Sequence, residues 1–221
     1  EDREFILTEL LHLLNQGIYI SKEHAKVILL DNLKKLSKVL GYGDFNQFLS
    51  ESFFLRLQPK DKSQYDLLII LEDILKSTYD IDINQCGSVV HKNFIYIDDI
   101  LGSGKTILRD VREWMSQNEN LKGFTSGDFK FCVLLFCNHK WSESRIRWSL
   151  KYNFNANIFT SSRDFVIISH YVISDNKKDF NTTFNLAIPQ KLDIKWDKYL
   201  ANIEGALLHE DRAYRDANQP K

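Results

Sequence analysis

The sequence has little of what membrane, disulfide-linked and metal-centred proteins require. No apolar run approaches the roughly 18 residues of a membrane-spanning helix. The three cysteines, Cys86, Cys132 and Cys137, do not have metal-ligand spacing, and the six histidines are scattered without pairing. A sparse, odd set of cysteines is typical of a reducing compartment. We therefore expect a cytoplasmic protein that uses neither a membrane nor a zinc or di-iron centre.

An excess of charge of either sign is missing as well. Lys and Arg number 29 and Asp and Glu 30, so the chain as a whole has a net charge of −1 and no general attraction to nucleic acid or lipid headgroups. Local charged patches remain compatible with this balance. The hydrophobic fraction of 43% and the charged fraction of 27% exclude global disorder and allow a sizeable core.

The segment that carries chemistry lies at residues 94–106. Four apolar residues lead into Asp98 and Asp99, and a short glycine-rich loop follows that ends in Lys105 and Thr106. The next residues place apolar side chains on one face of a helix: Ile107, Leu108, Val111, Trp114 and Met115. A strand end, a loop of backbone N–H groups and a helix N-terminus together form an anion site. Because two acids would repel a bare phosphate, we interpret them as holding ribose hydroxyls or a cation of the same ligand. The segment therefore predicts a ribose 5-phosphate site.

Two other interpretations fit parts of this segment. Gly104, Lys105 and Thr106 resemble the end of a Walker A loop, but that motif needs glycine at position 99, where Asp99 would direct negative charge into the phosphate cradle. Alternatively, Asp99 or Ser103 could cap the following helix. A cap alone does not require Ser, Gly and Thr together after two acids on a buried strand, so we favour ligand binding.

Taken together, the apolar strand, the paired acids and the small-Ser-Gly-x-Thr loop resemble the signature of type I phosphoribosyltransferases. The resemblance implies that Asp98 and Asp99 bind the ribose hydroxyls of phosphoribosyl pyrophosphate, directly or through Mg²⁺, as the catalytic and metal-binding pair. It also implies that the loop after them holds the 5′-phosphate with backbone amides and hydroxyls. The residues of that loop are Leu101, Gly102, Ser103, Gly104, Lys105 and Thr106.

The pattern along the chain predicts an α/β fold with a phosphoribosyltransferase-like, open, mostly parallel sheet. Strands are expected at 94–98, 129–137 and 165–168, with shorter ones around 86–90 and 183–188, and helices at 64–78 and 105–117. Right-handed connections are expected in such a sheet, with the ligand at the carboxyl ends of its strands. The acids and the loop fall at that edge.

Three regions are expected along the chain. Residues 1–58 are interpreted as an all-helical N-terminal module, with helices that begin at Ser21 and Asp44. Residues 59–195 form the phosphoribosyltransferase-like core. Residues 196–221 form a C-terminal helix that packs on the core or leads into a further region of a longer protein. The lysines of the N-terminal module are more typical of a solvated face than of a nucleic-acid reader.

A second constellation follows the long strand at 129–137. If the chain is helical from Ser142, then Trp141, Arg145 and Trp148 share one face. Two indoles and a guanidinium can stack on a base or meet a second phosphate. The other interpretation, that the two tryptophans pack under Arg145 for purely structural reasons, remains open.

The sequence supports binding of a ribose 5-phosphate better than standard transferase chemistry. Only about fifteen residues separate the helix at 64–78 from the strand at 94, which is short for a closing lid. The pyrophosphate loop has one poor candidate, at 56–60. We expect the ligand to be phosphoribosyl pyrophosphate or a nucleotide, with Mg²⁺ as the candidate cofactor.

The Asp-Asp-x-x-Gly-Ser-Gly-Lys form is most similar to the divergent phosphoribosyltransferase-like proteins of bacterial conflict systems, including those that accompany retrons. This resemblance implies an antiphage defence effector that acts by ribosyl transfer or by cleavage of a nucleotide N-glycosidic bond. It also implies a partner that holds the effector inactive, such as a reverse transcriptase with its nucleic acid. Two alternatives stay open: a catalytically silent nucleotide sensor, and a nucleic-acid-binding adaptor in which the N-terminal helical module, Arg145 and Arg147 contact phosphates.

Overall fold

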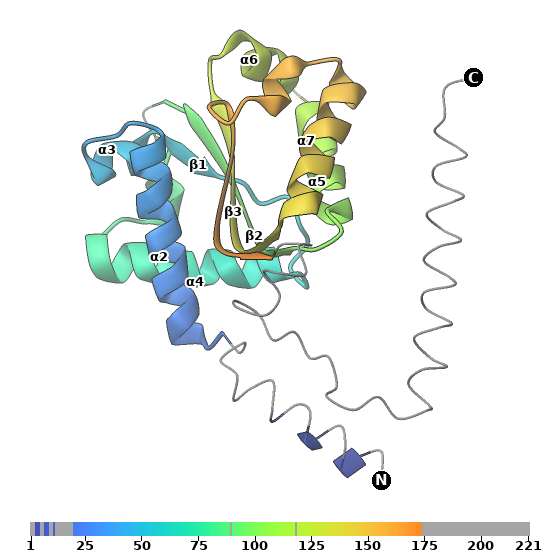
Figure 1. The fold of residues 1–221 in the computed structure, drawn as a ribbon. Helices are drawn as coiled ribbons and strands as arrows, with labels where there is room; N and C mark the ends of the chain where they lie inside the picture. Colours follow the sequence, from blue (N-terminus) through green and yellow to red (C-terminus); the bar gives the residue numbers. More distant parts are fainter. Residues whose placement is uncertain are drawn as a thin grey trace, which may run out of the picture. The chain divides into compact units, whose positions relative to one another are not determined.

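The computed structural model describes residues 3–4, 7–8, 11, 20–88, 90–117 and 119–173. The chain divides into two units, the first of which is Tyr19–Phe184. The regular elements of the first unit are α2 (Lys22–Val39), α3 (Phe45–Ser50), β1 (Ser52–Phe54), α4 (Ser63–Tyr79), η1 (Ile83–Gln85), β2 (Asn93–Leu101), α5 (Lys105–Met115), α6 (Asn120–Ser126), β3 (Lys130–His139), α7 (Lys140–Phe154), η2 (Asn157–Thr160) and β4 (Phe165–Ile173) (Figure 1).

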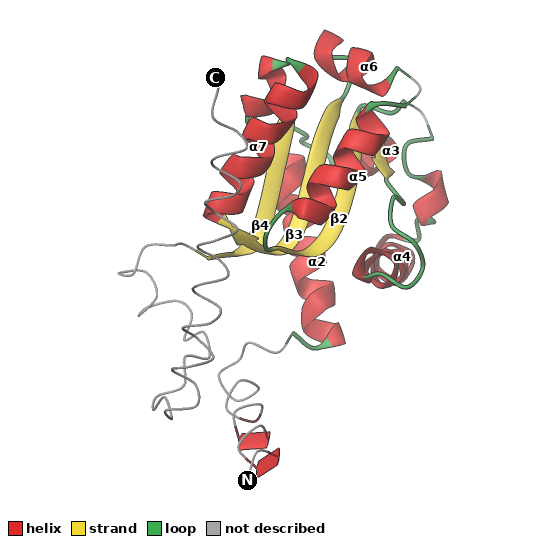
Figure 2. Cartoon of the chain, turned by 90° about the vertical axis from the view of Figure 1, so that its right-hand side faces the viewer, coloured by secondary structure: helices red, strands yellow, loops and turns green. Residues whose placement is uncertain are grey.

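The four strands form one open sheet in the order β1-β2-β3-β4, and every neighbouring pair is parallel (Figure 2). Strand β2 has a parallel neighbour on each side, with Phe94 opposite Phe53 of β1 and Phe131 of β3. The predicted α/β class with an open parallel sheet is therefore confirmed. The strand that carries Asp98 and Asp99 lies inside the sheet, as a ligand site at its carboxyl end requires.

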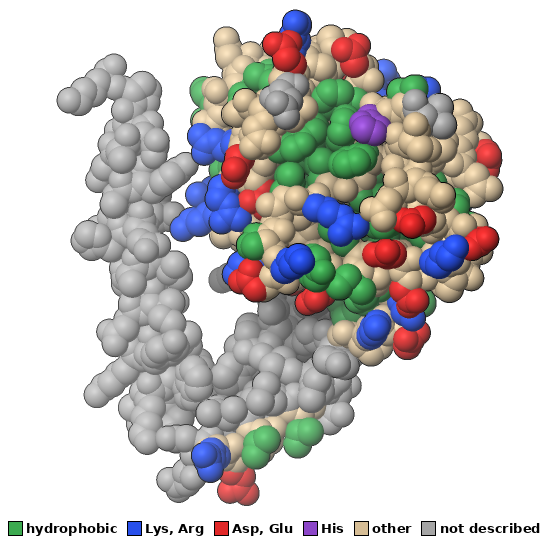
Figure 3. Space-filling view, turned by 180° about the vertical axis from the view of Figure 1, so that it is seen from behind, with side chains coloured by type: hydrophobic (Ala, Val, Ile, Leu, Met, Phe, Trp, Pro, Cys, Tyr) green, Lys and Arg blue, Asp and Glu red, His purple; other side chains and the backbone are tan. Residues whose placement is uncertain are grey.

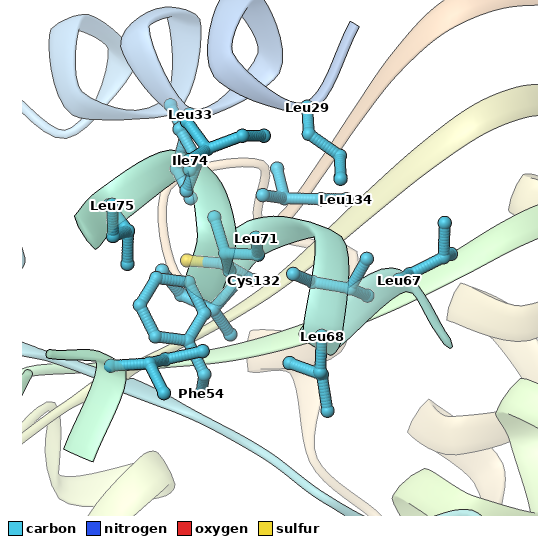
Figure 4. Close-up of a cluster of buried hydrophobic side chains, with 14 of the residues drawn as sticks. Leu29, Leu33, Phe54, Leu67, Leu68, Leu71, Ile74, Leu75, Cys132 and Leu134 are labelled. Atoms are coloured by element: carbon cyan, nitrogen blue, oxygen red, sulfur yellow. The ribbon is translucent and has the colours of Figure 1, made fainter. Parts of the chain in front are cut away.

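Helices α2 and α4 cover one face of the sheet. Their leucines meet alternate residues of the strands, among them Ile97 of β2 and Leu134 of β3. Figure 4 shows the centre of this cluster, where Leu29 and Leu33 of α2 and Leu71 of α4 lie around Cys132 and Leu134. Burial of each such leucine stabilises the fold by about 1.5–3 kcal/mol.

Helices α5 and α7 cover the other face, where aromatic residues fill much of the core. Phe131 of β3 stacks on Phe165 of β4, and Trp114 of α5 packs against Phe131. The aromatic contacts continue from Trp114 through Phe94 to Phe53 of the edge strand β1. The side chain of Phe53 is 38% exposed. On the surface seen from behind in Figure 3, hydrophobic side chains gather in one patch among interspersed charges.

The connections on the two faces of the sheet differ from each other in handedness. Strand order advances in one direction from β1 to β3, yet α4 packs on the face opposite to α5. The β1–α4–β2 and β2–α5–β3 connections must therefore have opposite hands. The expectation of right-handed connections throughout is wrong for one of them.

The expected N-terminal module does not stand apart from the sheet. Helices do begin after Ser21 and Asp44, whose side chains accept from the backbone N–H groups of His24 and Asn46. However, residues 52–54 form strand β1, so the region is not all-helical. Helix α2 also packs on the sheet, where Asn32 Nδ2 donates to Leu135 O at 2.9 Å. The structure thus has no boundary at residue 58.

Strand β1 occupies the sheet edge instead of the strand that we expected around residues 86–90. Residues 86–88 form a turn after η1, and Gly87 has a φ of +72° that an extended strand does not allow. The expected strand at 183–188, the boundary at 195 and the C-terminal helix at 196–221 lie outside the described residues. Within the part that is described, no helix is both long and apolar enough to span a membrane.

Candidate functional site

Asp98 and Asp99 lie next to each other near the carboxyl end of β2, but their side chains meet different surroundings. Asp98 is only 5% exposed, whereas Asp99 is exposed to solvent. Successive side chains of a strand point to opposite sides of the sheet, which accounts for the separation. The paired acids therefore cannot serve one ligand in equivalent ways.

The carboxylate of Asp98 is occupied by donors of the protein itself. Its Oδ1 accepts from Ser63 Oγ at 3.1 Å and from the backbone N–H of Asp99 at 3.0 Å. Its Oδ2 accepts from Gln58 Nε2 at 3.2 Å and lies 3.3 Å from the Tyr96 hydroxyl. Burial, followed by the charge of Asp99, raises the pKa of Asp98 to about 6. Asp98 thus acts on its neighbour by holding the Asp99 backbone.

The Tyr96 hydroxyl connects Asp98 to helix α5. It accepts from Gln58 Nε2 at 2.5 Å and donates to Asp110 Oδ2 at 2.8 Å. Arg109 pairs with the other oxygen of Asp110, at 2.9 Å from Nε and 2.7 Å from a terminal nitrogen. Burial raises the pKa of Tyr96 far above its ordinary value, so the phenol stays protonated. This network fixes the middle of α5 relative to β2.

Gln64 anchors the loop that follows β1. Its Oε1 accepts from the backbone N–H groups of Leu57 and Gln58 at 2.8 and 2.9 Å, and its Nε2 donates to Ile97 O at 3.1 Å. The side chain is 1% exposed, so these three bonds are made from inside the fold and hold the loop against β2. Ser63 and Gln64 were not predicted as part of the site, and Gln58 was included only within the poor candidate for a pyrophosphate loop at 56–60. The one sequence signal was a glutamine placed on the apolar face of α4, one turn before Leu67 and Leu68.

The loop after β2 turns tightly into α5. Gly104 is the N-cap residue with a φ of +76°, and a Cβ there would lie 3.0 Å from Ile146 Cδ1 of α7. Ser142 Oγ of α7 donates to Gly102 O, which fixes the loop from the other side. This close approach requires glycine at position 104.

The N-terminus of α5 has no side-chain cap. Asp99 Oδ1 accepts from the N–H of Ile100 at 2.7 Å instead, and Ser103 Oγ makes only a 3.5 Å contact with the N–H of Lys105. The capping interpretation is therefore not supported. Ser103, Lys105 and Thr106 are exposed, while the Leu101 side chain is buried in the core, so that residue can offer only its backbone.

Helix α7 places Trp141, Arg145 and Trp148 on one face, as predicted. The two indoles are 55% and 59% exposed, and Arg145 Cζ lies 5.3 Å from the Trp141 ring centroid. Arg147 differs from the expectation that it contacts phosphates. It pairs with Glu143 at 3.0 Å and donates to Phe165 O at 2.7 Å, so its guanidinium has a structural role.

A metal at this site would have few protein ligands. Among the described residues, no three His, Cys, Asp or Glu side chains form a group that could hold an ion. Mg²⁺ commonly binds through one or two carboxylates together with water and ligand oxygens. The exposed carboxylate of Asp99 fits this mode, whereas the oxygens of Asp98 already accept from the protein.

Comparison with known proteins agrees with the resemblance seen in the sequence. A family model described as PRTase-CE matches residues 1–217. No match was found among curated proteins or among solved structures. The model covers nearly the whole chain, including the strand, loop and helix that form the candidate site. The chain therefore belongs to the PRTase-CE family, which is phosphoribosyltransferase-like.

Proposed function

We propose that this protein binds a ribose 5-phosphate compound, phosphoribosyl pyrophosphate or a nucleotide, at the carboxyl end of β2 and acts at its C1′ atom. The observations that carry the proposal are the exposed Asp99 carboxylate near the carboxyl end of β2 and the N-terminus of α5, which no side chain caps. A helix N-terminus of this kind favours an anion, and an adjacent carboxylate accepts hydrogen bonds from a diol.

The 5′-phosphate is assigned to the loop at 102–106. Backbone N–H groups at the start of α5 and the hydroxyls of Ser103 and Thr106 are the proposed donors. The glycine at 102 has no neighbouring atom within 4 Å of a would-be Cβ, which leaves room for a ligand at the open side of the loop. Lys105 adds a positive charge to the same side.

The ribose hydroxyls are assigned to Asp99, alone or with Mg²⁺ that arrives with the ligand. Asp98 holds the Asp99 backbone through the 3.0 Å bond from its N–H and is therefore a positioning residue. Mg²⁺ would supply charge neutralisation for a pyrophosphate or phosphate group.

A second anion subsite is proposed on the loop after β1. The loop carries Arg56, Lys60 and Lys62 with exposed side chains, and its Gln58 reaches Asp98 directly. From the sequence, residues 56–60 were a poor candidate for this role. Because Gln58 of this loop contacts Asp98, the loop lies where a pyrophosphate or a base of the ligand could bind.

Chemistry at C1′ proceeds through an oxocarbenium-like centre, and two outcomes are consistent with the site. In transfer, a nucleophile bonds to C1′ while pyrophosphate leaves. In glycosidic cleavage, water bonds to C1′, the C1′–N bond breaks, and the water proton passes to the departing base. Exposure of Asp99 to solvent favours cleavage, because transfer enzymes must exclude water.

The narrower biological proposal is an effector of a bacterial antiphage system of the retron type. It is supported by the Asp-Asp-x-x-Gly-Ser-Gly-Lys form, and it implies that a reverse transcriptase with its nucleic acid restrains the activity. Expression without that partner should slow growth of the host cell, and Asp99→Asn should relieve the effect. A silent nucleotide sensor is the second candidate, favoured by the occupied carboxylate of Asp98.

Product analysis separates these candidates. The protein is incubated with phosphoribosyl pyrophosphate or with cellular nucleotides, with and without Mg²⁺, and the products are resolved by chromatography. We expect free base or a ribosylated product with the native protein and none with Asp99→Asn. Asp31→Asn, an exposed acid on α2, is the matched control and should keep full activity. Ligand binding without any product would favour the sensor function over the enzymatic one. Unchanged product formation by Asp99→Asn would contradict the assigned site.

A further inference from the structure

The outer face of α5 and α7 differs in charge from the rest of the chain. These two helices together carry seven basic and three acidic residues, within a chain of 29 basic and 30 acidic residues. Asp110 pairs with Arg109 and Glu143 pairs with Arg147, which leaves five basic residues and one acid, Glu113, outside these pairs. The surface of these helices is therefore locally cationic on a chain of nearly zero net charge.

Helices α5 and α7 lie side by side, so their exposed stripes form one surface. Arg112 of α5 donates to Asn153 Oδ1 of α7 at 2.7 Å, and Gly104 at the start of α5 approaches Ile146. The α5 stripe consists of Lys105, Arg109 and Arg112, all with exposed side chains. In Figure 3, Lys and Arg side chains gather at the left-hand edge of the folded unit, the side on which α5 lies.

The α7 stripe is aromatic. Trp141, Arg145, Trp148 and Tyr152 recur at helical spacing, and the three rings are 55%, 59% and 64% exposed. The Trp148 and Tyr152 rings lie 4.0 Å apart between centroids, and Arg145 lies over the Trp141 ring. The opposite face of the helix, with Ile146 and Leu150, already faces the core. Packing within the described residues therefore does not account for three large exposed rings in one row.

We propose that this surface, α5 and α7 together, binds single-stranded nucleic acid. Bases stack on exposed aromatic rings without sequence preference, and flanking Lys and Arg side chains follow the phosphate backbone. The row from Trp141 to Tyr152 is about 16 Å long, enough for a few stacked bases. Trp, Tyr and Arg are also common at protein interfaces, but the exposed Lys and Arg side chains of the adjacent α5 stripe complement the phosphates of a polyanion.

This inference goes beyond the proposed function, and its surface shares only Lys105 with the ribose 5-phosphate site. The row lies on the outer side of α7, whereas the ribose 5-phosphate site lies at the β2–α5 loop. A nucleic-acid strand would need only the cations and rings of the helices, so loss of the Asp99 carboxylate should leave its binding unchanged.

Fluorescence anisotropy of labelled 12-nucleotide DNA and RNA strands tests the inference. We expect both single strands to bind more tightly than a duplex of the same length, with an affinity that falls as salt rises. Quenching of tryptophan fluorescence on titration with unlabelled strands reports stacking directly. Trp148→Ala should weaken binding about tenfold, while Trp148→Phe should retain most of it.

Two further variants serve as controls for strand binding. Val39→Ala changes a side chain that is 58% exposed on α2 and should have no effect. Asp99→Asn should also bind the strands normally. Equal affinity for strand and duplex, or unchanged binding by a Trp141→Ala/Trp148→Ala double variant, would overturn the inference. Self-association that the double variant abolishes, in the absence of strand binding, would assign the row to a protein partner and overturn it as well.

Discussion

Asp98 and Asp99 are neighbours in the sequence, yet one belongs to the interior of the molecule and the other to its surface. Asp98 accepts hydrogen bonds from the β1 loop, from α4 and from the next residue, and it is nearly buried. Asp99 makes one local bond to the backbone and faces solvent beside the loop that leads into α5. The difference teaches that a paired-acid motif can divide its roles, with one carboxylate shaping the site and the other meeting the ligand.

The largest expected effect comes from the buried side of this comparison. Gln64→Met would remove the side chain that satisfies two backbone N–H groups and the buried carbonyl of Ile97. We expect the free energy of unfolding to fall by roughly 3 kcal/mol in urea titrations. Gln117→Met, at an exposed position, is the control and should change stability by less than about 0.5 kcal/mol. Equal stability of the two variants would mean that Gln64 does not anchor the loop.

The loop between β2 and α5 contains two glycines whose surroundings differ. In Gly104→Ala, alanine would have to adopt a φ of +76°, and its Cβ would lie 3.0 Å from Ile146. We therefore expect the free energy of unfolding to fall by roughly 1–3 kcal/mol. In Gly102→Ala, the added Cβ would have no atom within 4 Å, so the free energy of unfolding should stay nearly unchanged. Thermal unfolding of both variants checks the prediction. A similar loss at the two positions would contradict the geometry of the loop.

A smaller effect is expected from pH. The folded-state pKa of Asp98, at about 6, lies above the unfolded value near 4, so the folded protein binds more protons between these values. Stability from this group is therefore present at pH 4 and lost as pH rises through 6. Between pH 4 and pH 6 the native protein should therefore lose about 2 kcal/mol of unfolding free energy relative to Asp98→Asn. A difference that is flat with pH would place the pKa of Asp98 near its ordinary value.

Sequence reasoning identified the part of the site that is local. The apolar strand, the acids, the loop and α5 follow one another within residues 93–115, so their order fixes their arrangement. The helix N-caps at Ser21 and Asp44 were also predictable, because a cap depends only on a few adjacent residues.

The rest depends on contacts between distant residues. Strand β1 has only three residues, Ser52–Phe54, and becomes a strand through its pairing with β2 some 40 positions later. Gln58 and Ser63 reach Asp98 across 40 and 35 residues of sequence. No local pattern distinguishes such polar residues from those of an ordinary surface loop, so neither the burial of Asp98 nor its partners could be predicted.

Isothermal titration of phosphoribosyl pyrophosphate into Asp99→Asn and Asp98→Asn tests the division of roles most directly. Asp99→Asn should keep native stability and lose about 100-fold in affinity, because a carboxylate that accepts from ribose hydroxyls, or holds Mg²⁺ against them, is removed. Asp98→Asn should lose no more than about tenfold, because its carboxylate acts only through the Asp99 backbone. An affinity loss that is equal in the two variants, or larger for Asp98→Asn, would contradict the account.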